Sequence, residues 1–169
     1  MSDHHPDDFE IRPTPCLTGG QAAHIGVSNA ALTLAEHCLM LVPTAGHRRR
    51  GTAGLTAAVV QLRRILNELQ ARAITTDLLD GATMADIAGA LGMDEDLAYF
   101  QHGHLDWNHL ANDPQAVWDG LRPTCVSQVH DSCAADPITA ARHLDERYRK
   151  YIDPHEAAPV PQNAVTAGL

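Results

Sequence analysis

The chain has 169 residues, of which 44% are hydrophobic and only 4% aromatic, and it carries a formal net charge of −9. This length fits one domain with tails. No run of eighteen apolar residues is present, so we expect no transmembrane helix. The acidic N-terminus has no apolar segment, so we expect no secretory signal. We therefore expect a soluble cytoplasmic protein that does not contact a membrane and has no general attraction to nucleic acid.

The N-terminal third is expected to contain an arm, one helix and a basic loop. Residues 1–23 include several Pro, Asp and Gly residues and are interpreted as a flexible arm, followed by a helical domain over 24–152. Ser28 is a plausible N-cap for a helix that stops at Pro43. The loop after it carries a compact basic run, made of Arg48, Arg49 and Arg50.

A long helix is predicted over residues 52–80. Apolar side chains recur in it at steps of 4, 3, 4, 3 and 4, which is the spacing of a coiled-coil seam. The run is shorter than the three to four heptads of a free-standing coiled coil. Two alternatives follow: the seam packs inside the monomer, or it forms a homodimer through residues 55–73. The seam consists of Leu55, Val59, Leu62, Leu66, Leu69 and Ala73.

Residues 82–103 have the pattern of two short helices joined by a glycine turn. Thr83 is a candidate N-cap of the first helix, Gly92 accepts the left-handed backbone that ends it, and Asp94 is a candidate cap of the second. The second helix carries Leu97, Ala98 and Phe100. A shared core is expected from Ile87, Leu91 and Ala98.

This segment resembles helix-turn-helix regulators, especially the region-4-like modules of sigma factors and of related small bacterial regulators. The resemblance lies in Ile87-Ala88, followed by Leu91-Gly92 and the apolar Met93, and it covers only residues 82–103. It implies transcription regulation by DNA binding, with the second helix presented to the major groove.

The charges are distributed unevenly along the chain. Residues 46–72 contain six arginines and one acid, whereas residues 73–136 contain eleven acids and one base. The second short helix opens with Asp94, Glu95 and Asp96, where DNA readers usually carry Ser, Arg, Gln or Lys, and carboxylates repel phosphates. If DNA is the partner, we expect phosphate contacts from Arg48, Arg49, Arg50, Arg63 and Arg64, and base contacts from Tyr99, Gln101 and His102. The alternative is a protein-interaction module without DNA binding, whose acidic face docks a basic protein.

Histidines and cysteines gather between residues 102 and 133. Such side chains are ligands of zinc and late transition metals, but no Cys-x2-Cys pair is present, so we expect neither a metal nor a cofactor. An enzyme that uses this cluster is a third, less favoured alternative. The four cysteines, including Cys16 and Cys38, are expected to be reduced thiols. The candidate metal ligands are His102, His104, Cys125, His130 and Cys133.

The C-terminal part is expected to add short helices and a tail. Asp113-Pro114 and Asp136-Pro137 are cap and first-turn pairs that each begin a helix. After residue 153 the chain is rich in Pro and Ala without periodicity, so 153–169 is interpreted as a flexible tail. The last helix should face inward with Ile138, Ala141, Leu144, Tyr148 and either Tyr151 or Ile152.

The sequence thus predicts an all-α helical bundle in which a long helix leads into a helix-turn-helix. The function expected first is a dimeric, DNA-binding regulatory protein, and the second is a protein-interaction module.

Overall fold

The computed structural model describes residues 17–42, 53–103, 107–121, 136–151 and 165–166. This part of the chain is helical and contains no strand, which confirms the all-α prediction. No helix within it combines the length and apolarity that a membrane span requires. The helices are α1 (Gly19–Leu39), α2 (Gly54–Leu79), α3 (Met84–Leu91), α4 (Glu95–His102), α5 (Trp107–Ala111), α6 (Pro114–Leu121), α7 (Pro137–Tyr148) and the short 3-10 helix η1 (Arg149–Tyr151).

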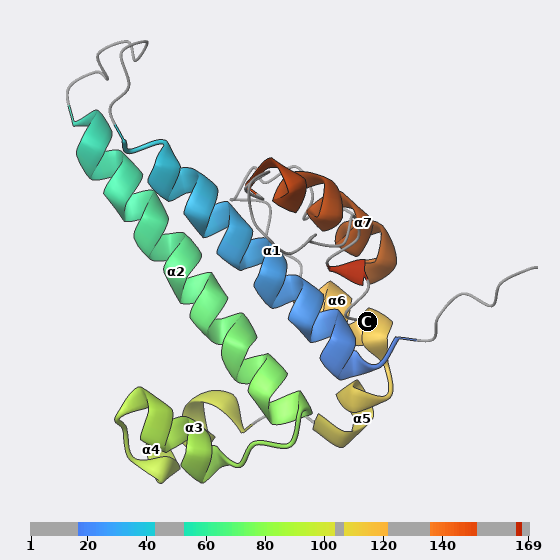
Figure 1. The fold of residues 1–169 in the computed structure, drawn as a ribbon. Coiled ribbons are helices and arrows are strands. Elements are labelled where there is room, and N and C mark those ends of the chain that lie inside the picture. The colour runs from blue at the N-terminus through green and yellow to red at the C-terminus, as the bar shows by residue number, and fades with distance from the viewer. Residues whose placement is uncertain (1–16, 43–52, 104–106, 122–135, 152–164, 167–169) are drawn as a thin grey trace, which may run out of the picture.

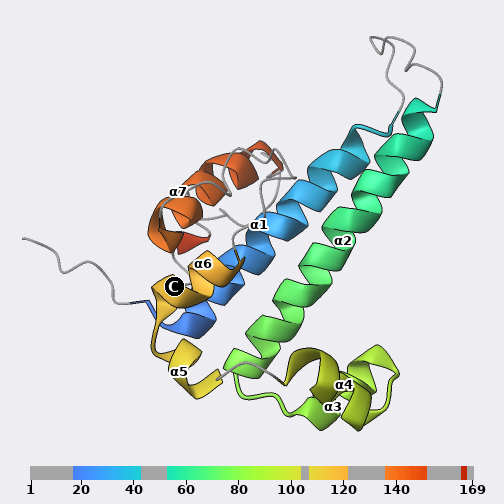
Figure 2. The same cartoon turned by 180° about the vertical axis from the view of Figure 1, so that it is seen from behind.

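Helices α1 and α2 form an antiparallel hairpin that runs the length of the molecule (Figure 1). On the side of α1 away from α2 lie α6 and α7, while α3 and α4 lie at the end of the hairpin where α2 finishes (Figure 2). The main core lies where α1, α6 and α7 meet. It contains Ile25, Trp118, Ala140, Ala141 and Leu144.

The start of α1 differs from the sequence prediction. The helix begins at Gly19 behind a capping box, in which the Thr18 hydroxyl accepts from the Gln21 amide and the Gln21 side chain accepts from the Thr18 amide. The prediction of Ser28 as the cap is therefore wrong, and residues 19–23 belong to the helix rather than to an arm. Gly19 is required for packing, because a Cβ there would clash with the carbonyl oxygen of Leu110 in α5.

The predicted long helix is confirmed by α2. Of the two alternatives for its seam, packing inside the monomer holds only in part. The buried side chains of α2 include Ile65, Arg72 and Thr76. Arg72 donates to the backbone oxygen of Gly26 in α1 at 2.9 Å. Burial lowers the pKa of this guanidinium, and the nearby Glu68 partly opposes that effect. The predicted seam is largely uncovered: Leu55, Val59 and Leu66 are 60%, 56% and 51% exposed, and Leu62, Leu69 and Ala73 are partly buried.

The predicted starts of α6 and α7 are confirmed. The Asp113 carboxylate accepts from the Ala116 amide at 2.9 Å, and the Asp136 carboxylate accepts from the Thr139 amide at 2.9 Å. Pro114 and Pro137 are the first residues of α6 and α7. These helices begin where local capping chemistry places them.

Part of the predicted tail is docked. The Asp145 carboxylate on α7, which is buried, accepts from the Val165 amide at 2.7 Å and from the Thr166 hydroxyl at 2.7 Å. Val165 also packs against the main core. The prediction of a flexible segment is therefore wrong for residues 165–166, whereas 153–164 and 167–169 lie outside the described residues.

Candidate functional site

The α3–α4 pair has the helix, glycine turn and helix that the sequence predicts. The Thr83 hydroxyl accepts from the Asp86 amide at 3.2 Å, and the Asp86 carboxylate accepts from the Thr83 amide at 2.8 Å, which forms the cap of α3. Hydrogen bonds from the Thr83 side chain and then from its backbone lower the pKa of Asp86. Gly92 ends α3 with a φ of +66°, and the Asp94 carboxylate caps α4 by accepting from the Asp96 amide at 2.9 Å.

This pair is anchored to the end of α2 by one side only. Ile87 of α3 is buried against Ile74 and Leu78 of α2. Ala98 of α4 is fully buried, and α4 packs chiefly on α3. The side of α4 that faces away from α3 is consequently uncovered at the end of the molecule, as Figures 1 and 2 show.

Large apolar side chains occupy this uncovered side. Phe100 is 83% exposed, Tyr99 64% and Leu97 46%. The sequence pattern places Phe100 in the second helix, and its exposure is a finding of the structure. The spacing in the sequence predicts this exposure. Phe100 follows Ala98 by two positions, about 200° around a helix axis, so the two side chains face opposite ways.

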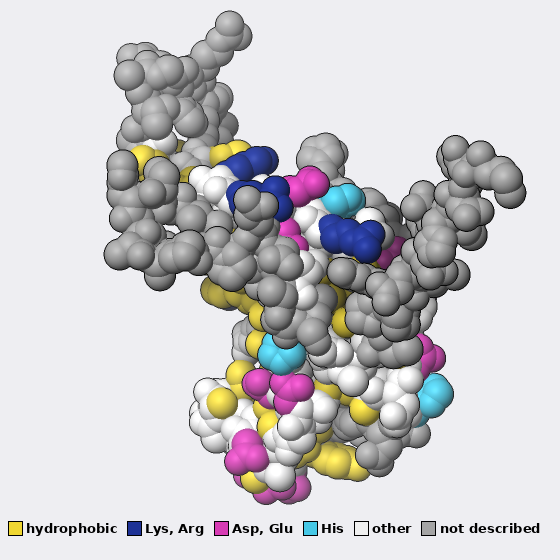
Figure 3. Space-filling model, turned by 45° about the vertical axis from the view of Figure 1, so that its right-hand side comes forward, with side chains coloured by type: hydrophobic (Ala, Val, Ile, Leu, Met, Phe, Trp, Pro, Cys, Tyr) yellow, Lys and Arg dark blue, Asp and Glu magenta, His cyan; other side chains and the backbone are white. Residues whose placement is uncertain are grey.

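The Asp and Glu side chains are the formally charged groups among the described residues of α3 and α4. Asp86, Asp94, Glu95 and Asp96 are all exposed, and residues 82–103 contain no Lys or Arg. In Figure 3, acidic and apolar side chains lie next to each other in the lower part of the molecule, whereas the Lys and Arg side chains drawn in colour lie in its upper part. We call the exposed side chains of Asp94, Glu95, Asp96, Leu97, Tyr99 and Phe100 the α4 surface.

The predicted base-reading residues belong to α4, whereas Arg63 and Arg64, two of the predicted phosphate contacts, do not lie beside them. Tyr99 and Gln101 are exposed and His102 is partly buried. Arg63 and Arg64 are exposed on α2, but fifteen or more residues before its end, which is about 22 Å along the helix. The run Arg48, Arg49 and Arg50 lies outside the described residues and is connected to the start of α2, the end opposite α3.

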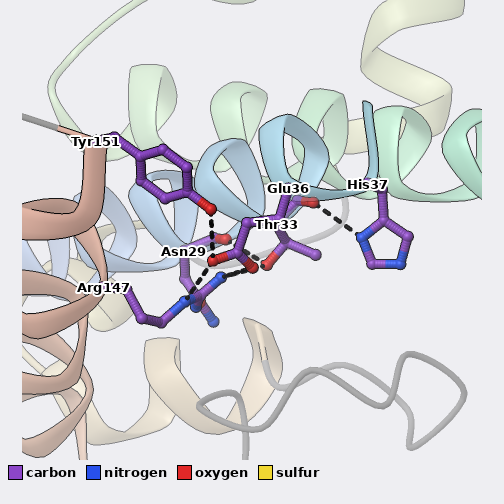
Figure 4. Close-up of polar contacts among 6 residues, drawn as sticks. All are labelled: Asn29, Thr33, Glu36, His37, Arg147 and Tyr151. Carbon is purple, nitrogen blue, oxygen red and sulfur yellow. Dashed lines mark hydrogen bonds and ion pairs between the residues drawn. The ribbon is translucent and has the colours of Figure 1, made fainter. Parts of the chain in front are cut away.

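A cluster of polar side chains joins α1 to α7 and lies apart from the α4 surface (Figure 4). Arg147 of α7 donates to the Glu36 carboxylate at 2.8 Å, to Asn29 Oδ1 at 2.8 Å and to the Thr33 hydroxyl at 3.3 Å. The Tyr151 hydroxyl donates to the same carboxylate at 3.3 Å. Partial desolvation and then the charge of Glu36 raise the pKa of Tyr151. Because these donors already have acceptors within the chain, the group acts as an interhelical clamp rather than as an anion site.

Beside this clamp, α1, α7 and Val165 border an open groove of about 680 Å³ with mainly apolar walls. Its polar side chains include His24 and Ser28, and His24 Nε2 lies 2.8 Å from Asp80 Oδ2. No hydrogen bond connects His24 to Ser28, and both side chains are exposed, so these three residues do not form an activated nucleophile.

The candidate metal ligands are not brought together by the part of the chain that the structure describes. His102 lies on α4, whereas His104, Cys125, His130 and Cys133 lie outside the described residues. Within the described ranges, no three His, Cys, Asp or Glu side chains are close enough to hold a metal ion. Cys38 is an exposed free thiol, and Cys16 lies outside the described residues.

Three comparisons with known proteins, namely with family models, with curated sequences and with solved structures, each found no match. Inference about function therefore depends on the α4 surface and on the charges around it.

Proposed function

We propose that this chain is a protein-interaction module whose α4 surface docks onto a partner protein that is basic and offers an apolar cleft. The observation that carries the proposal is Phe100, which is 83% exposed on a helix that has three acids in its cap and first turn and no Lys or Arg.

The apolar side chains supply the binding energy in this proposal. Aromatic side chains at the centre of an interface are typical hot spots, because they bury a large area at a low cost in side-chain entropy. Leu97 and Phe100 are three positions apart and share one side of this eight-residue helix, so a single cleft could accept both, and Tyr99 lies further around the axis at the border of that side. Exposed apolar side chains gathered in this way are typical of binding sites.

The acids supply orientation and partner choice. Asp94, Glu95 and Asp96 are at the N-terminus of α4, where the helix dipole favours negative charge. Their charge attracts Lys and Arg side chains and repels phosphate groups, so it selects a basic protein over a nucleic acid. Since these acids are exposed, we expect them to act mainly on the association rate and on the salt dependence.

DNA-binding regulation, which the helix-turn-helix resemblance implies, is the second candidate. The exposed Arg63 and Arg64 favour it. The acids of α4 oppose it, because that helix would have to enter a groove lined by phosphates. A homodimer through residues 55–73 and a cytoplasmic location are predictions that accompany both candidates.

Binding of defined probes, followed by fluorescence anisotropy, separates the two candidates. The first probe is a labelled amphipathic helical peptide with Lys and Leu at helical spacing, the second is the same peptide with Glu in place of Lys, and the third is a mixed-sequence DNA duplex. The variants are Phe100→Ala, the double variant Glu95→Gln/Asp96→Asn, and Val60→Ala as a matched control. Val60 is also strongly exposed, at 56%, but it lies on α2 away from the α4 surface.

We expect the Lys peptide to bind and the Glu peptide and the duplex not to bind. Phe100→Ala should weaken peptide binding by on the order of ten-fold or more, the double acid variant should weaken it and reduce its salt dependence, and Val60→Ala should leave it unchanged. The proposal fails if Phe100→Ala and Val60→Ala behave alike, or if the duplex binds at low salt and the peptide does not.

A further inference from the structure

The seam of α2 is a motif of the sequence that the α4 surface does not involve. Its six side chains keep a strict 4-3 spacing from Leu55 to Ala73 on a continuous helix. Its N-terminal part is the most exposed, with Leu55 at 60% and Val59 at 56%. An apolar stripe of this length on an exposed helix is a candidate interface.

The packing of α1 shows that the seam faces a different direction from the hairpin contact. Ile65 and Arg72 are buried and lie one heptad apart. On a helical wheel they lie about 90° from the centre of the stripe formed by Val59, Leu62 and Leu66. The α1–α2 hairpin therefore leaves Val59 and Leu66 exposed and covers Leu62 only in part.

We infer that a second copy of this chain covers the seam, so that two α1–α2 hairpins pair through α2 into a four-helix arrangement. A heptad spacing fits best against a helix with the same spacing, because each side chain enters a hole between four residues of the partner. A second copy supplies that spacing, and two-fold pairing uses the same surface on both subunits.

The size of the seam sets the strength of this association. The seam spans about 28 Å of helix. A lengthwise contact through one helix on each side falls short of the roughly 800 Å² per partner of a standard stable interface. Leu39, Met40 and Val42 are also at least half exposed, at the same end of the hairpin as Leu55. The dimer is therefore weak and concentration-dependent, with dissociation in the micromolar range or above.

Pairing through α2 leaves α4 uncovered, because the seam ends before the residues of α2 that hold α3. A dimer of this kind presents two α4 surfaces. Its existence does not depend on what those surfaces bind.

Two adjacent valines give a matched test by sedimentation equilibrium of the full chain. Val59 lies on the seam and Val60 lies about 100° further around the helix, and both are 56% exposed. Val59→Glu and Val60→Glu thus place the same charge at equal exposure, and neither should disturb the monomer. Circular dichroism and the thermal midpoint check that both variants fold like the original chain. Leu66→Glu is a second seam variant.

The original chain should approach twice its monomer mass of 18.2 kDa as its concentration is raised toward a few hundred micromolar. Val59→Glu and Leu66→Glu should remain monomeric over this range, with association weakened by on the order of ten-fold or more, and Val60→Glu should associate like the original chain. A monomer at every concentration overturns the inference, and so does an equal loss in Val59→Glu and Val60→Glu.

Discussion

The α1–α7 clamp and the α4 surface differ in which side chains are buried and which are exposed. At the clamp, Arg147, Asn29 and Thr33 are buried and Glu36 is partly exposed, and these four side chains satisfy one another across two helices. On the α4 surface, the acids are solvated and large apolar side chains are exposed.

This difference indicates which of the two regions holds the fold together and which is available for binding a partner. A buried polar group whose hydrogen bonds are all made within the chain fixes the arrangement of helices and has no donors left for a ligand. An exposed aromatic side chain contributes nothing to the folding of the monomer. Mutations at the clamp should therefore change stability and leave binding intact, whereas mutations on the α4 surface should do the reverse.

The largest stability effect is expected from Arg147→Met. Methionine keeps the apolar stem but leaves Asn29, Thr33 and Glu36 without their shared donor. We expect a loss of about 2–3 kcal/mol in the free energy of unfolding, measured by urea titration. Glu36 is partly solvated, at 30% side-chain exposure, which keeps the loss below that of a fully buried pair.

Arg142→Met is the matched control, because Arg142 is exposed on the same helix. It should change the unfolding free energy by no more than about 0.5 kcal/mol. Equal losses in the two variants would show that α7 depends on charge alone and that the clamp has no structural role.

Smaller changes in stability, of opposite sign, are expected when alanine replaces Gly19 in α1 and Gly89 in α3. At Gly19, a Cβ would clash with the backbone of α5, so Gly19→Ala should lose about 1–3 kcal/mol by overpacking, although alanine is the better helix former. At Gly89 in α3, a Cβ would meet no atom within 4 Å, so Gly89→Ala should gain up to about 1 kcal/mol. Thermal unfolding of the two variants checks the opposite signs, and a gain in Gly19→Ala would contradict the close packing of α1 on α5.

Local chemistry made much of this fold predictable from the sequence. Thr83, Asp94, Asp113 and Asp136 all cap the helices that were assigned to them, and Gly92 has the left-handed backbone that its position predicts. Caps and tight turns depend on residues within three or four positions of one another, so a single sequence contains the information.

Features that depend on distant partners were not predictable in this way. Arg147 and Asp145 are not among the inward-facing residues predicted for the last helix, yet both are buried, because their partners are Asn29 and Glu36 in α1 and Val165 near the C-terminus. Likewise, the 4-3 spacing of α2 does not indicate which side of the helix α1 covers. Periodicity identifies a face, but only packing decides what covers it.

The smallest effect is expected on the dependence of stability on pH, and it concerns the helix caps at Asp136 in front of α7 and at Asp86 in α3. The hydrogen bond from the Thr139 backbone is the main cause that lowers the pKa of Asp136, against a smaller opposing effect of burial. Because the folded pKa lies below the unfolded value, the carboxylate contributes stability above about pH 4. That contribution is lost as the pH falls through the folded pKa. Asp136→Asn keeps an N-cap acceptor but removes the titration, so its unfolding free energy should fall less steeply than that of the original chain between about pH 4 and pH 2.

Asp86→Asn makes the same change at the cap of α3, where hydrogen bonds from Thr83 lower the pKa of Asp86 in the same direction. Because α3 is held to α2 on one side only, we expect this variant to alter the acid dependence of amide exchange within α3 and α4 more than that of global unfolding. Urea titrations and hydrogen exchange over the same pH range measure the two effects. If both variants shift global unfolding equally, the α3–α4 pair unfolds together with the core and is not a separate region in stability.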